Sequence, residues 1–149
     1  MTAIDDVDAL LECYKLATAE FIKGNPEPYK MLFSHREDVT LANPFFPVVR
    51  GWNEVSEVLE RTASRLRDGE FLGSEIVAKY VTPELAYIVE IERTKAKVGE
   101  REDVAPIALR ATMIRPEEGT WKVVHRHADT IITAQPARAM IQQKFIPGG

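Results

Sequence analysis

The chain has 149 residues, of which 45% are hydrophobic and 28% charged, a size and composition typical of one globular domain with a real core. Its 19 Lys and Arg face 23 Asp and Glu, and this net charge of −4 argues against a nucleic-acid binder, which normally has a basic surface. No apolar run is long enough to span a bilayer, and the N-terminus carries Asp5, Asp6 and Asp8 where a signal peptide is basic. We therefore expect a cytoplasmic protein without nucleic-acid or membrane partners.

The first half of the sequence predicts three helices. Apolar residues recur at three- and four-residue steps over 4–23, which predicts a long amphipathic helix, and we interpret Cys13 within it as a buried structural thiol. A short second helix is expected at 28–33 and a short strand at 39–43. Prolines and a glycine then predict a loop, and a third helix is expected from Trp52 to near Asp68.

The second half predicts strands. Four segments alternate or carry strand-forming residues and are separated by turn or charged sequences: 71–81, 85–97, 104–115 and 120–132. Helices followed by a four-strand antiparallel meander define an α+β domain, with helices covering one face of a curved sheet. We expect one domain over 1–149, with a core of about 4–132 and a C-terminal extension in which 136–145 could add a helix that clasps a partner.

Two sets of segments carry a family resemblance. The first is Asp38-Val39-Thr40-Leu41-Ala42-Asn43-Pro44 followed by Val49-Arg50-Gly51, and the second is Leu109-Arg110-Ala111-Thr112 leading to Gly119–His127. With the order of elements, they resemble the NTF2-like superfamily, in its SnoaL-like or DUF4440-like branch, which shares the ketosteroid isomerase-like fold. The resemblance implies a cone-shaped domain with an apolar pocket for a small molecule, and a homodimer formed through the open sheet.

The resemblance also implies departures from isomerase chemistry. The isomerases place their general-base aspartate directly before the proline that follows the first strand, and here that position is Asn43. An amide cannot accept a proton at physiological pH. Ala17 stands at the helix position of the isomerase's oxyanion-binding tyrosine, and Tyr14 lies one turn earlier on the same helix face. Both departures argue against steroid isomerisation.

The last hairpin carries polar residues where a core would be apolar. Alternation places Trp121, Val123, His125, His127 and Asp129 on one face. A turn of two or four residues around Glu117-Glu118 pairs Arg110 with His125 and Thr112 with Val123, which groups Arg110, Thr112, His125 and His127. A one-residue bulge would reverse this pairing and substitute Arg126.

Arginine can bind a carboxylate or enolate oxygen, and histidine can transfer a proton near neutral pH. The predicted catalytic residues are therefore His125, His127 and Arg110; structural roles or dimer contacts are the alternative for the histidines. The predicted ligand-binding residues are Tyr14, Asn43, Trp52, Glu90, Thr112 and Arg126. Trp52 could instead be a core anchor, and Glu90 and Glu92 could simply pair with Arg110 or Arg93. Glu90 or Asp129 could complete a metal site with His125 and His127, but we predict no metal and no cofactor.

The sequence thus predicts a small-molecule-binding protein with a hydrophobic pocket floored by Arg and His. The ligand is expected to be apolar with a carbonyl or acid group. Such a protein is either a cofactor-independent isomerase, cyclase or dehydratase-type enzyme, or a non-catalytic ligand-binding or dimeric assembly module.

Overall fold

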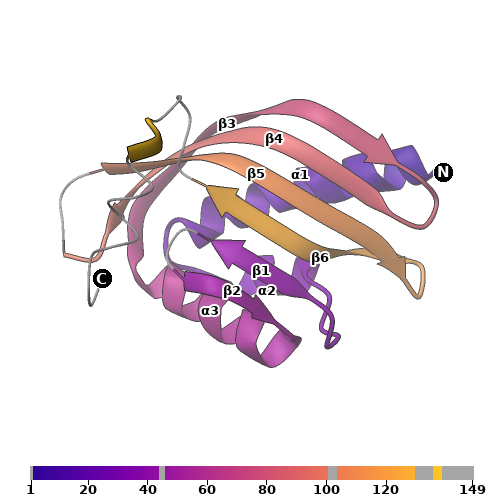
Figure 1. Ribbon diagram of the computed structural model, residues 1–149, viewed down its shortest axis with the longest axis horizontal. Coiled ribbons are helices and arrows are strands. Elements are labelled where there is room, and N and C mark those ends of the chain that lie inside the picture. The colour runs from indigo at the N-terminus through magenta and orange to yellow at the C-terminus, as the bar shows by residue number, and fades with distance from the viewer. Residues whose placement is uncertain (1, 44–45, 101–103, 130–135, 139–149) are drawn as a thin grey trace.

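Three helices and six strands make up the fold of the computed structural model, which describes residues 2–43, 46–100, 104–129 and 136–138 (Figure 1). The helices are α1 (Ala3–Phe21), α2 (Glu27–Leu32) and α3 (Trp52–Ser64). The strands are β1 (Thr40–Asn43), β2 (Phe46–Arg50), β3 (Leu66–Val81), β4 (Ala86–Val98), β5 (Val104–Glu117) and β6 (Thr120–Asp129). This α+β architecture is the predicted one. The helix considered for 136–145 lies mostly outside the described residues.

Helix α1 begins with a capping box, in which Thr2 and Asp5 exchange side-chain and backbone hydrogen bonds. Its buried stripe contacts the sheet and consists of Val7, Leu10, Leu11, Tyr14, Ala17, Thr18 and Phe21. Cys13 lies just beyond the edge of this stripe and is exposed, so the prediction of a buried thiol is wrong. An apolar residue type does not by itself predict burial on this helix, since Leu16 is 73% exposed.

The sheet has the strand order β2-β1-β6-β5-β4-β3. Strands β3 to β6 form the predicted antiparallel meander, and β1 extends it by pairing in parallel with β6. The loop predicted after β1 is in fact strand β2, which pairs antiparallel with β1. Pro47 is compatible with this position because β2 is an edge strand, where a missing backbone donor is tolerated.

Helix α3 ends at Ser64 and not near Asp68, because the chain turns directly into β3, where buried Leu66 pairs with Val98. Strand β3 then passes very close to the end of α1. A Cβ atom on Gly69 would lie 2.1 Å from the carbonyl oxygen of Ile22, so only glycine fits there.

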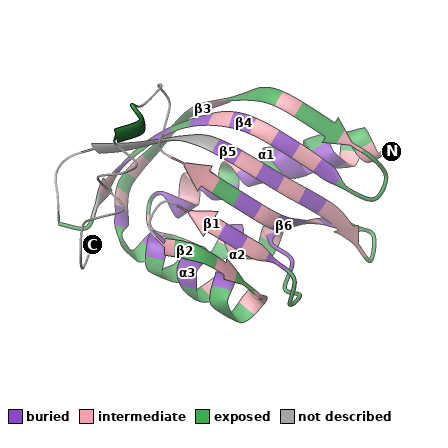
Figure 2. Cartoon of the chain, viewed as in Figure 1, coloured by how far each residue is buried: buried purple, intermediate pink, exposed green. Residues whose placement is uncertain are grey.

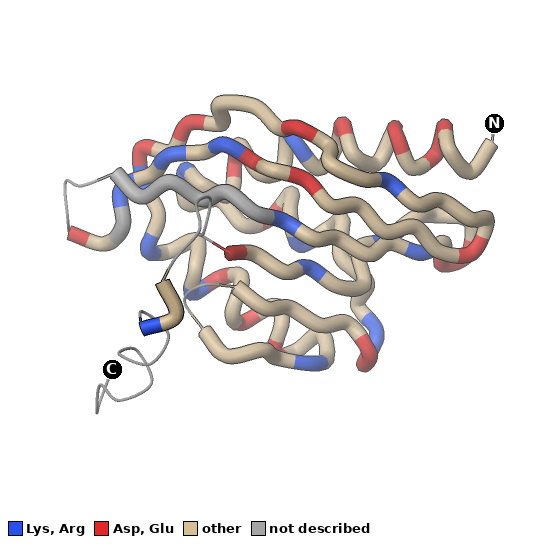
Figure 3. The backbone as a smooth tube through the Cα atoms, turned by 45° about the horizontal axis from the view of Figure 1, so that its top comes forward, with Lys and Arg blue, Asp and Glu red and all other residues tan. Residues whose placement is uncertain are grey.

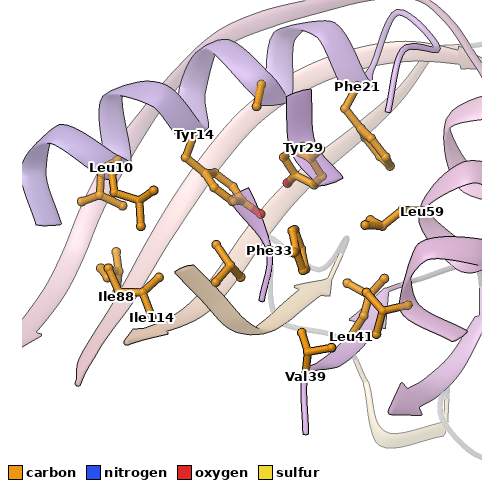
Figure 4. Packing of buried hydrophobic residues seen from close by; sticks show 14 of the residues in the cluster. Leu10, Tyr14, Phe21, Tyr29, Phe33, Val39, Leu41, Leu59, Ile88 and Ile114 are labelled. Carbon is orange, nitrogen blue, oxygen red and sulfur yellow. The ribbon is translucent and has the colours of Figure 1, made fainter. Parts of the chain in front are cut away.

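The helices cover one face of the curved sheet, called here the inner face, and the buried residues gather between the two layers (Figure 2). At the centre, the Tyr29 ring lies 4.8 Å from that of Tyr14 and 4.6 Å from that of Phe21 (Figure 4). Ile88 and Ile114 close the core from the sheet side (Figure 4). The opposite side of the sheet is called the outer face.

A β-bulge in β6 decides which side chains reach the inner face. Val123 pairs with Ile114 and His125 pairs with Met113, so Val124 is an extra residue in the ladder. Both valines are buried, and the carbonyl of Val123 accepts a hydrogen bond of 2.8 Å from the backbone N–H of Ser34. Because one extra residue exchanges the two faces of a strand, the single face predicted for Trp121 through Asp129 is wrong.

Candidate functional site: a buried Arg-Glu cluster beside an apolar cavity

An interior cavity of about 40 Å³ lies between the helices and the inner face. A water molecule needs roughly 10–15 Å³ of such space, so the cavity has room for a few non-hydrogen atoms. Its lining comes from all three helices or their ends and from β1, β3, β4, β5 and β6: Thr18, Phe21, Ile22, Tyr29, Leu41, Asn43, Leu59, Thr62, Leu66, Glu92, Arg110, Arg126 and Ala128. Most of this lining is apolar, and the charged side chains all come from the sheet.

The charged side chains form one cluster on neighbouring strands. Glu92 on β4 accepts hydrogen bonds of 3.2 Å from Arg110 Nε and 3.1 Å from Arg126 Nη2. Arg126 also donates to Thr112 Oγ1 at 2.9 Å, and its guanidinium lies 4.5 Å from the centre of the Tyr14 ring. Glu92 and Arg126 are each 2% exposed and Arg110 is 6% exposed. Such burial is tolerated only because the charges are paired and hydrogen-bonded.

Two glutamates on the same face of β4 have different environments. Burial alone would raise the pKa of Glu92, but the charges of Arg126 and Arg110 and their hydrogen bonds lower it below its usual value. Glu90 lies 3.9 Å from Arg126 Nη1. Burial and the neighbouring Glu92 raise the pKa of Glu90, with Arg126 and Arg110 opposing the shift. Glu92 is therefore a fixed anion at neutral pH, whereas Glu90 is the carboxylate that takes up a proton more readily.

The Tyr14 hydroxyl is buried and has no hydrogen-bond partner among the described residues. Burial raises the pKa of Tyr14 well above its usual value, although Arg126 opposes the shift. The phenol is therefore neutral and keeps a proton to donate. An unsatisfied buried hydroxyl costs roughly 1–3 kcal/mol, so this group is suited to bind a water molecule, although Tyr14 is not among the residues that line the cavity.

Asn43 lines the cavity at the end of β1, but its amide is engaged. Its Nδ2 donates to Thr62 Oγ1 at 3.1 Å, and its Oδ1 accepts from the backbone N–H of Phe46 at 3.0 Å. These bonds link the end of β1 to α3 and to the first residue of β2. The amide therefore has a structural role at the position where the resemblance placed a general base.

The structure places His125 and His127 on the outer face, away from Arg110 and Thr112. The bulge puts Arg126 opposite Thr112 and Ala128 opposite Arg110, so the predicted pairing of Arg110 with His125 and Thr112 with Val123 is wrong. The arrangement that the bulge alternative described, with Arg126 in the cluster, is the observed one.

On the outer face, His125 Nδ1 and Thr40 Oγ1 lie 2.7 Å apart, and the two imidazole rings lie 6.5 Å apart. Burial, with a smaller effect of His127, lowers the pKa of His125. Glu90 lies on the inner face and so cannot join the histidines in a metal site. No group of three potential metal ligands occurs among the described residues.

Trp52 lies apart from the cavity. Its indole stacks on the ring of His35 with 3.9 Å between the centres, and both line a separate surface cleft at the start of α3. Of the residues predicted for the site, Tyr14, Asn43, Glu90, Arg110, Thr112 and Arg126 come together on the inner side. Glu92, Tyr29 and Thr62 were not among the predicted site residues; the one available signal was Glu92 in alternation with the apolar Ile88.

Comparison with solved structures defines the class of protein. An NTF2-like protein from Streptomyces avermitilis, described as a proposed dehydratase, aligns with a TM-score of 0.69 at 18% identity, over 89% of this chain and 100% of that one. A ketosteroid isomerase-like protein from Erwinia carotovora atroseptica also gives 0.69, at 16% identity over 87% and 96%. An NTF2-like superfamily protein from Salmonella enterica gives 0.67, at 15% identity over 89% and 94%. The fold is therefore NTF2-like.

The sequence identifies the family within that class. Residues 10–133 match the model of the SnoaL-like domain, and the chain belongs to this family. Comparison with curated proteins gives no match. None of the described helices has the length and apolar character needed to cross a membrane.

Proposed function

We propose that this SnoaL-like protein binds a small organic acid, or a related molecule with a carbonyl group, in the interior cavity. The observation that carries the proposal is the buried cluster of Arg126, Glu92 and Arg110 beside an apolar lining. Buried ion pairs are often no more stable than apolar residues of the same size, so their presence at a cavity favours a binding role. Arginine provides charge-assisted hydrogen bonds to the acid, and the apolar walls accept the rest of the ligand.

Binding without catalysis is the function that this lining favours. Proton abstraction requires a base near the ligand with a suitable pKa. Among the described lining residues, Asn43 is an amide engaged in two hydrogen bonds, and Glu92 is held as an anion by two arginines. Glu90, the carboxylate with the raised pKa, is not one of the lining residues. The catalytic roles of His125 and His127 stay a prediction from the sequence, and these residues lie across the sheet from the cavity.

A thermal-shift experiment with matched probes tests this function. Propionate should raise the melting temperature, whereas propionamide, which has a similar shape but no charge, should have a much smaller effect at equal ionic strength. A ligand at a hundred times its Kd stabilises the folded state by about 2.7 kcal/mol. Arg110→Met should abolish the propionate effect, and Arg93→Met, which removes an exposed arginine on the same sheet, should retain it. Equal responses to acid and amide, or an unchanged response in Arg110→Met, would contradict the proposal.

The outer face supports the proposal that the protein is a homodimer. Cross-strand pairing aligns Tyr80, Tyr87, Met113 and His125 in one row across four strands. A second row contains Ala78, Val89, Ala111 and His127. A solvated face of an antiparallel sheet normally carries polar residues at such positions. We propose that a second copy of the chain covers these rows.

A further inference from the structure

We propose that the cavity takes up one proton with each carboxylate it binds, and that Glu90 is the residue that accepts this proton. The inference rests on the proposed function, because it concerns the same ligand and the same cluster. It adds a property that the binding proposal does not require: an affinity that depends on pH although the ligand and both arginines keep their charges.

The charges of the buried cluster balance when both glutamates are ionised. Arg110 and Arg126 contribute two positive charges, and Glu90 and Glu92 contribute two negative charges when both are ionised. The four residues are all buried, and none is more than 7% exposed. An incoming carboxylate would leave this buried group with an excess negative charge. Protonation of one glutamate restores neutrality, since buried charge without a counter-charge is strongly unfavourable.

The hydrogen bonds decide which glutamate is protonated. Glu92 accepts hydrogen bonds from both arginines, and these bonds would be weakened if it carried a proton. Glu90 forms a longer ion pair with Arg126, at 3.9 Å, and receives no side-chain hydrogen bond from the described residues. Protonation of Glu90 therefore weakens fewer hydrogen bonds than protonation of Glu92 would. Its raised pKa in the ligand-free protein points the same way.

The neighbouring charged groups of Glu90 on α1 and β3 are paired with other residues. From α1, Lys15 is close enough to act on Glu90, but it forms an ion pair with Glu12. On β3, Ile76 stands opposite Glu90, and the next charged inner residue, Lys79, pairs with Asp8 of α1.

The remaining neighbours lie on β5 and β6. Arg110 stands directly opposite Glu90, and Thr112 accepts its hydrogen bond from Arg126. Both arginines keep their charge throughout the physiological range. Glu90 is thus the group whose charge can change when the ligand arrives.

Calorimetry with propionate as the probe tests the proton count. Titrations at one pH near 6, in buffers with different heats of ionisation, give the number of protons taken up on binding. We expect close to one proton for the wild type and none for Glu90→Gln, which carries no titratable group at that position. Over the range from about pH 6 to 8, where propionate stays ionised, the wild-type affinity should fall by up to tenfold per pH unit, and that of Glu90→Gln should stay constant. Glu84→Gln, at an exposed turn residue, should behave as the wild type.

The outcomes separate the two proposals. Propionate binding with no proton uptake, or with the same uptake in Glu90→Gln, would overturn the role of Glu90 and leave the binding function standing. No propionate binding at any pH would overturn the proposed function itself. Far-UV circular dichroism checks the fold of Glu90→Gln; if that variant does not fold, Glu90→Met takes its place, and a wild-type proton count of zero still overturns the inference.

Discussion

At the scale of single residues, the buried ion pairs on the inner face have the largest energetic consequences. Arg126 is in contact with Glu92, Thr112 and the Tyr14 ring at once. Removing it leaves the carboxylate of Glu92 buried with one counter-charge fewer. The cluster is stable only while all its members are present, because the loss of one side chain leaves another buried charge without a hydrogen bond or counter-charge.

Arg126→Met should therefore lower the free energy of unfolding by about 3–5 kcal/mol, as expected when one partner of a buried pair is removed. Urea denaturation measures this loss. The control is Arg93→Met, because the ion pair of Arg93 with Glu75 is exposed and should contribute less than about 1 kcal/mol. Similar stabilities of the two variants would show that the buried cluster is not important for stability.

Glu90 should make stability depend on pH in a direction opposite to that of most carboxylates. Its folded-state pKa is raised, so the stability associated with its neutral form is complete below the unfolded pKa and is lost as the pH rises through the folded pKa. Glu90→Gln remains neutral, and its stability relative to the wild type should increase with pH above about 4.5 and then level off. Urea midpoints between about pH 4 and 8 follow this difference. A relative gain by the wild type on raising the pH would contradict the assignment.

Many of the polar residues near the cavity could be predicted from the sequence. The sequence did not show which polar residues of β6 lie on the inner face of the sheet and which lie on the outer face. The sequence predicts Arg110, Thr112 and Glu90 for the site because each is polar within a strand pattern, and the family resemblance adds Asn43. The error concerned His125 and His127, and its cause is the pair Val123-Val124. Both side chains suit a core equally well, so the sequence pattern does not reveal that one of them is an extra residue.

At the scale of elements, the contact between β3 and the end of α1 limits what the chain can tolerate. The backbone of Gly69 lies against Ile22, and no side-chain movement can relieve a clash between a Cβ atom and a backbone carbonyl. Strand β3 therefore depends on a residue without a side chain at this crossing.

Gly69→Ala should destabilise the protein by about 1–3 kcal/mol or more, the range typical of overpacking in a closely packed region. Thermal unfolding monitored by circular dichroism gives the change in melting temperature. Ser74→Ala on the same strand adds no atoms and should stay within about 0.5 kcal/mol of the wild type. A Gly69→Ala variant as stable as Ser74→Ala would show that α1 and β3 can move apart at little cost.

The elements that were missed have weak sequence signals. The sequence predicts a loop in place of β2 because Pro47 lies inside it, and only the edge position of β2 makes a proline acceptable. The predicted end of α3 is too late because Ala63 and Leu66 continue the helical spacing of apolar residues. The pairing of Leu66 with Val98 overrides that local preference. Long-range pairing of this kind is not encoded in the local pattern.

At the scale of the whole molecule, acidic and basic side chains are interspersed along the chain (Figure 3). The uncommon feature is the outer face, where apolar and aromatic side chains continue across β3, β4 and β5 up to the two histidines of β6. Coverage by a second copy would remove this surface from water.

Val89→Asp and Met113→Asp should each convert the dimer to a monomer, because both place a charge within the apolar rows. Sedimentation velocity measures the mass of each variant, and the propionate-induced thermal shift shows whether the cavity remains intact. Leu16→Asp introduces the same charge at an exposed position of α1 and should leave the dimer unchanged. A monomeric wild type, or dimeric forms of both sheet variants, would contradict this interface.

The extra valine in β6 has a consequence for how such proteins can diversify. If substitutions elsewhere removed the bulge without changing the length of β6, regular alternation would turn His125 and His127 toward the cavity and Arg126 toward the outer face. Ligand chemistry and assembly would change together, without any substitution in the residues that touch either partner. The presence or absence of one bulge therefore decides whether a strand of this sequence presents arginine or histidine to the interior.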